Sequence, residues 1–236
     1  MKSLLVITPV KNSIELTEQA IRSVMQSADK QSWEYVVYDD FSTIDNACRL
    51  DELADELGFE VVHLSQLLDT PSPNYRYVLQ QAQKRAISEN CHLVVVESDV
   101  VVNQDTFVKL INRVEDKVGM VASVTVDEKG NVNFPYLFAR CWKSIDVETR
   151  KRFSFCCTLL TNQFLKSYDF NDLDPTKNWY DVFISHKSIE LGFKNILQMT
   201  NQVLHYPHSS RPWKLLKYTN PLKYYWIKYT KGFDKI

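Results

Sequence analysis

The stretch Leu93 to Asp99, Leu-Val-Val-Val-Glu-Ser-Asp, decides the fold class of this chain of 236 residues. Four apolar, mostly β-branched residues in a row are typical of a strand buried on both faces, as in a parallel sheet. The run ends in Glu97 and Asp99, whose side chains point to the same side in extended backbone. Neighbouring carboxylates repel each other unless a cation lies between them, and oxygen ligands suit Mg²⁺ or Mn²⁺. The stretch therefore predicts either a cation site at a sheet edge or, in the plainer alternative, a solvated strand end.

Strand-like and helix-like segments alternate through the first half of the chain. Expected strands cover residues 4–7, 33–38, 59–64 and 93–96, and expected helices cover residues 15–27, 46–57, 75–89 and 105–116. This alternation indicates an α/β fold with a parallel sheet flanked by helices. Polar clusters at 8–12, 39–42 and 97–99 follow three of the strands, and the carboxyl ends of parallel strands share one edge. We therefore expect these clusters to line one crevice.

The second half of the chain breaks this rhythm. Apolar runs predict strands at residues 120–126, 131–142, 152–160 and 196–204, with a helix at 180–192. The length favours a single domain, which we place at residues 1–208. Residues 209–236 form a separate tail, in which basic and aromatic side chains are interleaved.

Glycine is too scarce for a glycine-rich phosphate loop. The chain has five glycines, and none follows the first expected strand. Dinucleotide dehydrogenases and P-loop enzymes bind diphosphates on such loops, so both classes are disfavoured. A phosphorylated ligand would need a metal ion or a basic side chain instead, which the Glu97–Asp99 pair and Arg76 would supply.

Charge and cysteine content restrict the partners and the compartment. The net charge of −1 gives no indication of a nucleic-acid partner, and we expect none. Five scattered cysteines without a C-x-x-C motif fit a reducing, cytoplasmic compartment, and they argue against disulfides or a zinc site. We interpret the cysteines, His63 and His92 as structural. No apolar run approaches the length of a membrane span.

The order and spacing of several segments resemble those of a known family. The segments are LLVITPVKN (4–12), VVYDDFS (36–42), NYRYVLQQAQKRA (74–86), LVVVESDVVVNQDTF (93–107), WYDVFISHKSIELGFKN (179–195) and VLHYPH (203–208). Together they resemble the inverting glycosyltransferases of family 2, including the spore-coat polysaccharide enzymes. The resemblance covers roughly residues 3–208. It implies a GT-A fold, with a Rossmann-like, mixed, mostly parallel sheet, a nucleotide-binding half (1–103) and a smaller acceptor half (104–208).

The resemblance assigns a nucleotide site to the strand ends. The matching positions are Thr8, Pro9, Asn12, Asp39, Asp40, Arg76 and Ser98. Asp39 corresponds to the acid that binds the base, and Arg76 to a basic residue near the base and phosphates. Phe41 stands where the family commonly has glycine. The implied donor is a nucleoside diphosphate sugar, with UDP preferred.

The resemblance also assigns a metal site and a catalytic base. Glu97 and Asp99 correspond to the D-x-D motif, and His205 to a histidine that completes the site for Mn²⁺ or Mg²⁺. Asp181 corresponds to the general base, although the family's preceding glutamate is here Tyr180. A carboxylate that deprotonates the attacking alcohol contributes about 10²–10⁴-fold to the rate.

Several single residues have simpler interpretations. Asp181 could be the N-cap of the following helix, a frequent role for aspartate, and Asp172 and Asp174 are rival bases. His205 could be a packed or surface histidine, and His208 could take its place. Asp39 and Asp40 could be turn formers, and Arg76 a surface helix residue.

The predicted function is a metal-dependent, inverting glycosyltransferase for a glycan or lipid-linked acceptor, in polysaccharide, capsule or glycolipid assembly. Two alternatives stay open, a non-catalytic relative that binds sugar nucleotides and a sugar-phosphate nucleotidyltransferase. Residues 211–236 carry seven Lys or Arg against one Asp, which leaves about −7 for residues 1–210. Such a tail suits peripheral contact with the inner face of a membrane or, alternatively, a helix packed on the domain.

Overall fold

The computed structural model describes residues 3–206, 216 and 220–231, which divide into two compact units. The first unit ends at His205, and the second begins at Tyr206. The elements of the first unit are β1 (Leu4–Val10), α1 (Ile14–Met25), β2 (Trp33–Asp39), α2 (Ile44–Leu57), β3 (Glu60–His63), α3 (Tyr75–Ser88), β4 (His92–Val96), β5 (Val100–Val101), α4 (Thr106–Ile111), β6 (Val118–Val126), β7 (Val147–Glu148), β8 (Cys157–Leu160), α5 (Asn162–Ser167), α6 (Tyr180–Glu190) and β9 (Lys194–His205). The second unit contains α8 (Pro221–Lys231). Among the described helices, none has the length and apolar character needed to cross a bilayer.

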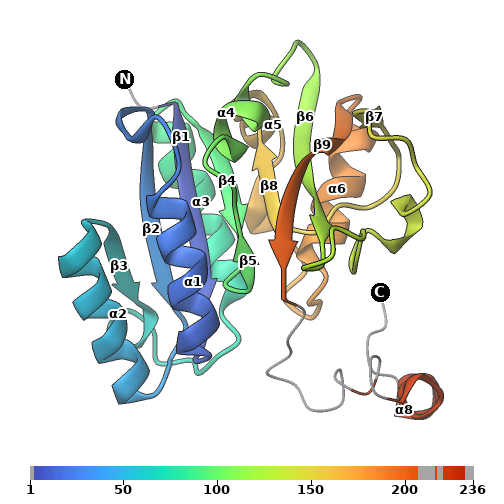
Figure 1. Ribbon diagram of the computed structural model, residues 1–236. Helices are drawn as coiled ribbons and strands as arrows, with labels where there is room; N and C mark the ends of the chain where they lie inside the picture. Colours follow the sequence, from blue (N-terminus) through green and yellow to red (C-terminus); the bar gives the residue numbers. More distant parts are fainter. Residues whose placement is uncertain (1–2, 207–215, 217–219, 232–236) are drawn as a thin grey trace. The chain divides into compact units, whose positions relative to one another are not determined.

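The strands of the first unit form one mixed sheet in the order β3-β2-β1-β4-β8-β6-β9-β5, with β7 beside β9 (Figure 1). The pairs β3-β2, β2-β1 and β1-β4 are parallel, as is β6-β9. β8 is antiparallel to both β4 and β6, so it joins the two parallel parts. The predicted α/β class with a mixed, mostly parallel sheet is confirmed.

Both faces of the sheet are buried, as the apolar runs predicted. Along β4, Leu93 and Val95 belong to one core cluster, while Val94 and Val96 belong to the other. Helices α3, α5 and α6 contribute to the first cluster, and α1, α2 and α4 contribute to the second. Figure 1 shows α1 and α3 on opposite faces of the strands β1 and β2. Because helices cover both faces of the sheet, polar side chains lie mainly at the ends of the strands.

The expected strand at 131–142 is wrong. Only Val132 makes an isolated bridge, to Val126, and a short 3₁₀ turn follows at Leu137–Ala139. Pro135 lies in this segment and has no N–H for a ladder. Tyr136 is fully buried in the first core cluster. The apolar run therefore marked a loop that buries Tyr136 and Ala139 and leaves Leu137 and Phe138 exposed, rather than a strand.

Other differences concern bounds and short elements. The helix expected at 105–116 ends at Ile111, and the strand expected at 152–160 begins only at Cys157. The two-residue strands β5 and β7 and the helix α5 were not predicted. The first unit lies within the expected domain of residues 1–208, and its division into halves stays a prediction. His208 and most of the tail lie outside the described residues.

Packing of β6 against α6 depends on Gly119. A Cβ at this position would lie 2.2 Å from Ser188 Oγ and 2.8 Å from Phe193 Cβ. We expect Gly119→Ala to lower the free energy of unfolding by about 2–3 kcal/mol, measured by urea denaturation, because packed atoms must move. Gly130→Ala is the control, since its Cβ meets nothing within 4 Å and only its φ of +77° is unfavourable, which costs about 1 kcal/mol. Equal losses in the two variants would contradict the described packing.

Candidate active site

Strand pairing brings two distant segments, around Cys156 and His205, to the end of β4. Val96 is paired with Cys157, and the Glu97 N–H donates to the Cys156 carbonyl at 3.0 Å. One residue beyond Asp99, Val100 is paired with His205 in the β5-β9 ladder. The predicted metal ligands Glu97, Asp99 and His205 are therefore brought together, with Cys156 as an additional neighbour.

The ligand atoms of these residues form a compact group, which we call the β4-end cluster (Glu97, Asp99, Cys156 and His205). One ligand atom each from Glu97, Cys156 and His205 lies within 4.8 Å of the others. Cys156 Sγ is 3.1 Å from Glu97 Oε2, and His205 Nε2 is 3.5 Å from Asp99 Oδ2. Cys156, His205 and Asp99 are only 1%, 4% and 7% exposed. The cluster therefore offers oxygen, nitrogen and sulfur donors in a mostly buried site.

Burial and mutual charge dominate the electrostatics of this cluster. Burial, followed by the charge of Asp99, raises the pKa of Glu97 to about 7. Burial lowers the pKa of His205, but its hydrogen bond with Asp99 and the charges of Asp99 and Glu97 outweigh this effect and raise it. Burial and the same two carboxylates raise the pKa of the Cys156 thiol well above its usual value. A divalent cation would neutralise this repulsion, so the donor set fits the metal that the family resemblance implies.

Asp181 lies in the first turn of α6 and interacts with the cluster. Its charge contributes to the raised pKa of Glu97 and of Tyr75. The N-cap of α6 is Trp179, so the interpretation of Asp181 as the N-cap is wrong. The rival acids Asp172 and Asp174 are exposed. Asp181 therefore interacts electrostatically with Glu97, and its role as the general base stays a prediction.

Two tyrosines not singled out from the sequence also face this region. The Tyr75 hydroxyl is buried and has no hydrogen-bond partner among the described residues. Burial, then the charges of Glu97 and Asp181, raise the pKa of Tyr75. Burial and the charge of Cys156 raise the pKa of Tyr136, whose hydroxyl donates to the Ser154 carbonyl. Tyr75 therefore offers a neutral hydroxyl close to both carboxylates.

The acids at the end of β2 are held by neighbouring side chains. Asp39 is buried and lies 2.8 Å from His63 Nδ1, and its other oxygen accepts from the Ser42 N–H. Asp40 accepts from Ser72 Oγ and from both nitrogens of Asn74. Asp40 therefore fixes the loop before α3.

Asn12 joins the loops after β1 and β2. Its N–H donates to Ser42 Oγ, and its side-chain oxygen accepts from the Thr43 N–H. Its φ of 55° lies in the left-handed region, which asparagine tolerates better than most residues. The predicted neighbours Asn12, Asp39 and Asp40 are therefore brought together at one edge.

Thr8, Arg76 and two loop residues complete the predicted nucleotide set. Thr8 is fully buried, and its hydroxyl accepts from the Tyr35 hydroxyl, so this side chain is committed to the core. Arg76 donates to the Asn171 carbonyl, and its charge lowers the pKa of Asp174 as a minor contribution beside the Thr176 hydrogen bonds. Pro9 and Ser98 are partly exposed at the ends of β1 and β4. Arg76 thus lies beside the 171–174 segment rather than bonded to the β2 acids.

Cys156, Tyr75 and His63 are the residues that the sequence analysis missed or treated as structural. Cys156 lies within the apolar run at 152–160 and forms no motif, and only the antiparallel β4-β8 register brings it to Glu97. His63 ends β3 next to Asp39 in the parallel ladder. The position of His63 at a strand end was the one sequence signal that could have identified it.

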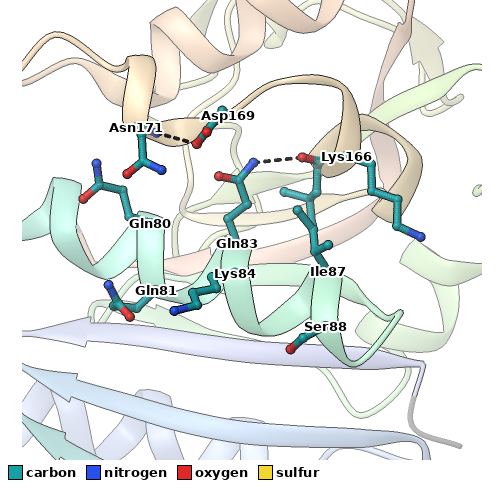
Figure 2. Close-up of a pocket in the computed structure, with 10 residues that line it drawn as sticks. Gln80, Gln81, Gln83, Lys84, Ile87, Ser88, Lys166, Asp169 and Asn171 are labelled. Carbon is teal, nitrogen blue, oxygen red and sulfur yellow. Dashed lines mark hydrogen bonds between the residues drawn. The ribbon is translucent and has the colours of Figure 1, made fainter.

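A separate groove of about 670 Å³ lies beside α3 (Figure 2). Gln83 holds its two walls together, since its amide donates to the Leu165 carbonyl and accepts from the Phe170 N–H. None of the predicted site residues lines this groove. The groove therefore shares no lining residue with the β4-end cluster.

Comparisons with known proteins identify the family of this chain. The profile described as glycosyl transferase family 2 matches residues 5–167, so the chain belongs to that family. A comparison with curated protein sequences gives no match. The family expected from the sequence is confirmed.

Solved structures show the same fold at low identity. TarS 1–349 of S. aureus has a TM-score of 0.66 at 19% identity, covering 87% of this chain and 60% of that one. GalNAc-T7, crystallised with UDP, GalNAc and Mn²⁺, has a TM-score of 0.64 at 14% identity, covering 89% and 45%. The mannosyltransferase PcManGT from Pyrobaculum calidifontis, in complex with GDP-Man and Mn²⁺, has a TM-score of 0.59 at 18% identity, covering 94% and 62%. This chain therefore has the GT-A fold and spans about 60% of the length of TarS 1–349.

The His63–Asp39 contact gives a pH-dependent prediction. Burial lowers the pKa of His63, but hydrogen bonds with Asp39 and Asp51 outweigh it and raise the pKa. The folded state therefore binds the His63 proton more tightly than the unfolded state. The resulting contribution to the free energy of unfolding is present below about pH 6.5 and is lost as the pH rises through the folded-state pKa of His63. We expect His63→Gln to lower the free energy of unfolding at pH 6 by about 1–2 kcal/mol and by less at pH 9. The exposed His186→Gln is the control, and an equal loss at both pH values would contradict the charged contact.

Proposed function

We propose that the protein is a metal-dependent, inverting glycosyltransferase that transfers a sugar from a nucleoside diphosphate sugar, with UDP preferred. The observation that carries the proposal is the β4-end cluster beside Asp181 at the carboxyl end of a parallel sheet. The Mn²⁺ in the GalNAc-T7 and PcManGT structures, and the UDP-GlcNAc in a TarS complex, support a nucleotide-sugar donor and a divalent ion.

The donor would bind along the strand ends. Asp39, held by His63, would accept a hydrogen bond from the base, and Asp40 and Asn12 would keep the surrounding loops in place. Pro9, Ser98 and the Thr8 backbone would line the same crevice. Arg76 would reach the phosphates after leaving the Asn171 carbonyl.

Glu97, Asp99 and His205 would hold Mn²⁺ or Mg²⁺ against the diphosphate. Bound there, the ion supplies charge neutralisation for the departing nucleoside diphosphate. The protein has no glycine loop after β1 to supply that neutralisation with backbone N–H groups. The acids at the end of β4 would therefore hold the diphosphate through the bound ion.

Asp181 would act as the general base. It lies near Glu97 but on a different element, α6, so it can face the side of the sugar opposite the diphosphate. A single displacement by an alcohol that Asp181 deprotonates inverts the configuration at the anomeric carbon. The Tyr75 hydroxyl, neutral because its pKa is raised, would donate a hydrogen bond to the reacting sugar or acceptor.

Two variants separate donor binding from catalysis. We expect Asp181→Asn to reduce hydrolysis or transfer from a UDP-sugar by at least about 100-fold, while the Mn²⁺-dependent thermal shift with UDP is retained. We expect Asp99→Asn to abolish that shift, because ligand stabilisation follows the affinity for the native state. Thermal shift and chromatography of released UDP measure the two effects.

The same measurements on the parent protein, together with an assay of pyrophosphate release, distinguish the alternatives. A UDP shift without turnover in the parent protein would indicate a non-catalytic sugar-nucleotide-binding relative. Pyrophosphate release from a nucleoside triphosphate and a sugar phosphate would indicate a nucleotidyltransferase. Retention of full activity in Asp181→Asn would contradict the role of the base.

We also propose that the enzyme contributes to polysaccharide, capsule or glycolipid assembly at the cytoplasmic face of a membrane. All five cysteines are free, as expected in a reducing compartment. Helix α8 exposes Leu222, Tyr225, Trp226 and Tyr229, which have the spacing of one helical face. The surplus of basic residues at 211–236 complements anionic headgroups, and this combination suits a lipid surface.

Vesicle binding tests the lipid contact. We expect the double variant Trp226→Ala/Tyr229→Ala to weaken binding to phosphatidylserine-containing vesicles at least about tenfold, because it removes most of the apolar face. Thr230→Ala, an exposed position on the same helix, is the control. Sedimentation with vesicles measures the bound fraction. Binding of the double variant equal to that of the parent would reject the lipid contact.

A further inference from the structure

The β4-end cluster contains a sulfur atom that is not among the oxygen and nitrogen ligands of the proposed metal site. Cys156 is 1% exposed, and its Sγ lies 3.1 Å from Glu97 Oε2. The Glu97 N–H donates to the carbonyl of Cys156, the residue before β8, so the two backbones are held side by side. His205 Nε2 or Nδ1 lies within 4.8 Å of both ligand atoms. A cation held by Glu97 and His205 would therefore contact the sulfur.

We propose that Cys156 is a metal ligand and that the β4-end cluster binds a thiophilic divalent cation, Zn²⁺ or Cd²⁺, in competition with Mn²⁺. This inference rests on the cation site of the proposed function and adds a ligand and a metal preference. It replaces the expectation that the cysteines are structural and that the chain has no zinc site.

The donor chemistry supports this preference. Thiolate sulfur favours zinc and softer metals, whereas Mg²⁺ and Mn²⁺ favour carboxylate, carbonyl and water oxygens. One carboxylate, one imidazole and one thiolate are three protein ligands, which leave a fourth position of a tetrahedral ion open to an oxygen of substrate or water. Asp99 lies 3.5 Å from His205 Nε2, where it orients the imidazole or takes the fourth position.

The geometry requires only a small contraction. Metal–ligand distances of about 2.0–2.3 Å place the ligands of a tetrahedral zinc ion about 3.3–3.8 Å apart. The three ligand atoms already lie within 4.8 Å of one another, so side-chain rotation can close the remaining difference. On binding, the thiol proton leaves to solvent and the sulfur donates its electron pair, with no change in oxidation state.

Of the two adjacent cysteines, Cys156 belongs to the ligand group with Glu97 and His205 and Cys157 does not. Cys157 is also fully buried. Burial raises the pKa of Cys157 to about 12, and its side chain interacts with Ser123. Cys157 is therefore a matched internal control.

The experiment uses the full chain with the exposed Cys48 and Cys141 changed to serine, without nucleotide. Cd²⁺ titration is followed by the ultraviolet charge-transfer band of a cadmium–thiolate bond, and Zn²⁺ binding by calorimetry. We expect one Cd²⁺ per chain, and we expect Cys156→Ser to abolish the band and weaken Zn²⁺ binding at least about tenfold. Cys157→Ser is expected to retain both. We expect Mn²⁺ affinity to change by less than about threefold in Cys156→Ser, because Mn²⁺ gains little from sulfur.

Three results would overturn the proposal: an unchanged band in Cys156→Ser, loss of the band in Cys157→Ser alone, or no cadmium–thiolate band in the parent. Cys156→Ala is measured beside Cys156→Ser, with thermal melting to verify folding, so a folding defect in one variant does not decide the result. The Mn²⁺-dependent shift with UDP is recorded on the same samples. Its persistence without a thiolate band would leave the proposed function intact, while a thiolate band without the UDP shift would contradict the proposed function alone.

Discussion

The short antiparallel ladder between β5 and the end of β9 is the constraint on which the site depends. It contains only two residue pairs, Val100 with His205 and Val101 with Leu204. This ladder places the last residue of β9 beside the acids that end β4, about a hundred positions earlier in the chain. A one-residue slip would turn His205 to the opposite face of the strand. The candidate metal site is therefore a consequence of register as much as of composition.

The β4-end cluster is electrostatically unfavourable by itself. Glu97 and Asp99 lie close together with little solvent, which is why the pKa of Glu97 rises to about 7. A fold does not gain stability from such a group, since burying like charges costs free energy. The buried cores on both faces of the sheet supply the stability that offsets the cost of these buried charges. Strongly perturbed ionisable groups of this kind concentrate at functional sites, where a bound ion or substrate relieves the repulsion.

The loops at the end of β2 are organised by side chains instead of glycines. Asp40 accepts hydrogen bonds from Ser72 and Asn74, and Asn12 links the loops after β1 and β2. These bonds order the loops before any ligand binds, which reduces the conformational entropy lost on binding. No glycine follows β1, so these loops lack the dense backbone N–H groups of a phosphate loop. The ordered loops at the end of β2 and the proposed cation site at the end of β4 lie on the two sides of β1, which pairs with both strands.

The sequence by itself determined the local and periodic features. Doubly buried strands such as Leu93–Val96, the helix that ends at Gly58, the family, and the acids at strand ends all follow from spacing along the chain. Only the tertiary structure decided that residues 131–142 form a loop anchored by the buried Tyr136, that Asp181 is not an N-cap, and that Cys156 lies beside Glu97. The physical reason is that periodicity reports which faces are buried. Contacts such as Cys156 with Glu97 arise from the pairing of strands distant in sequence, whose register no local pattern records.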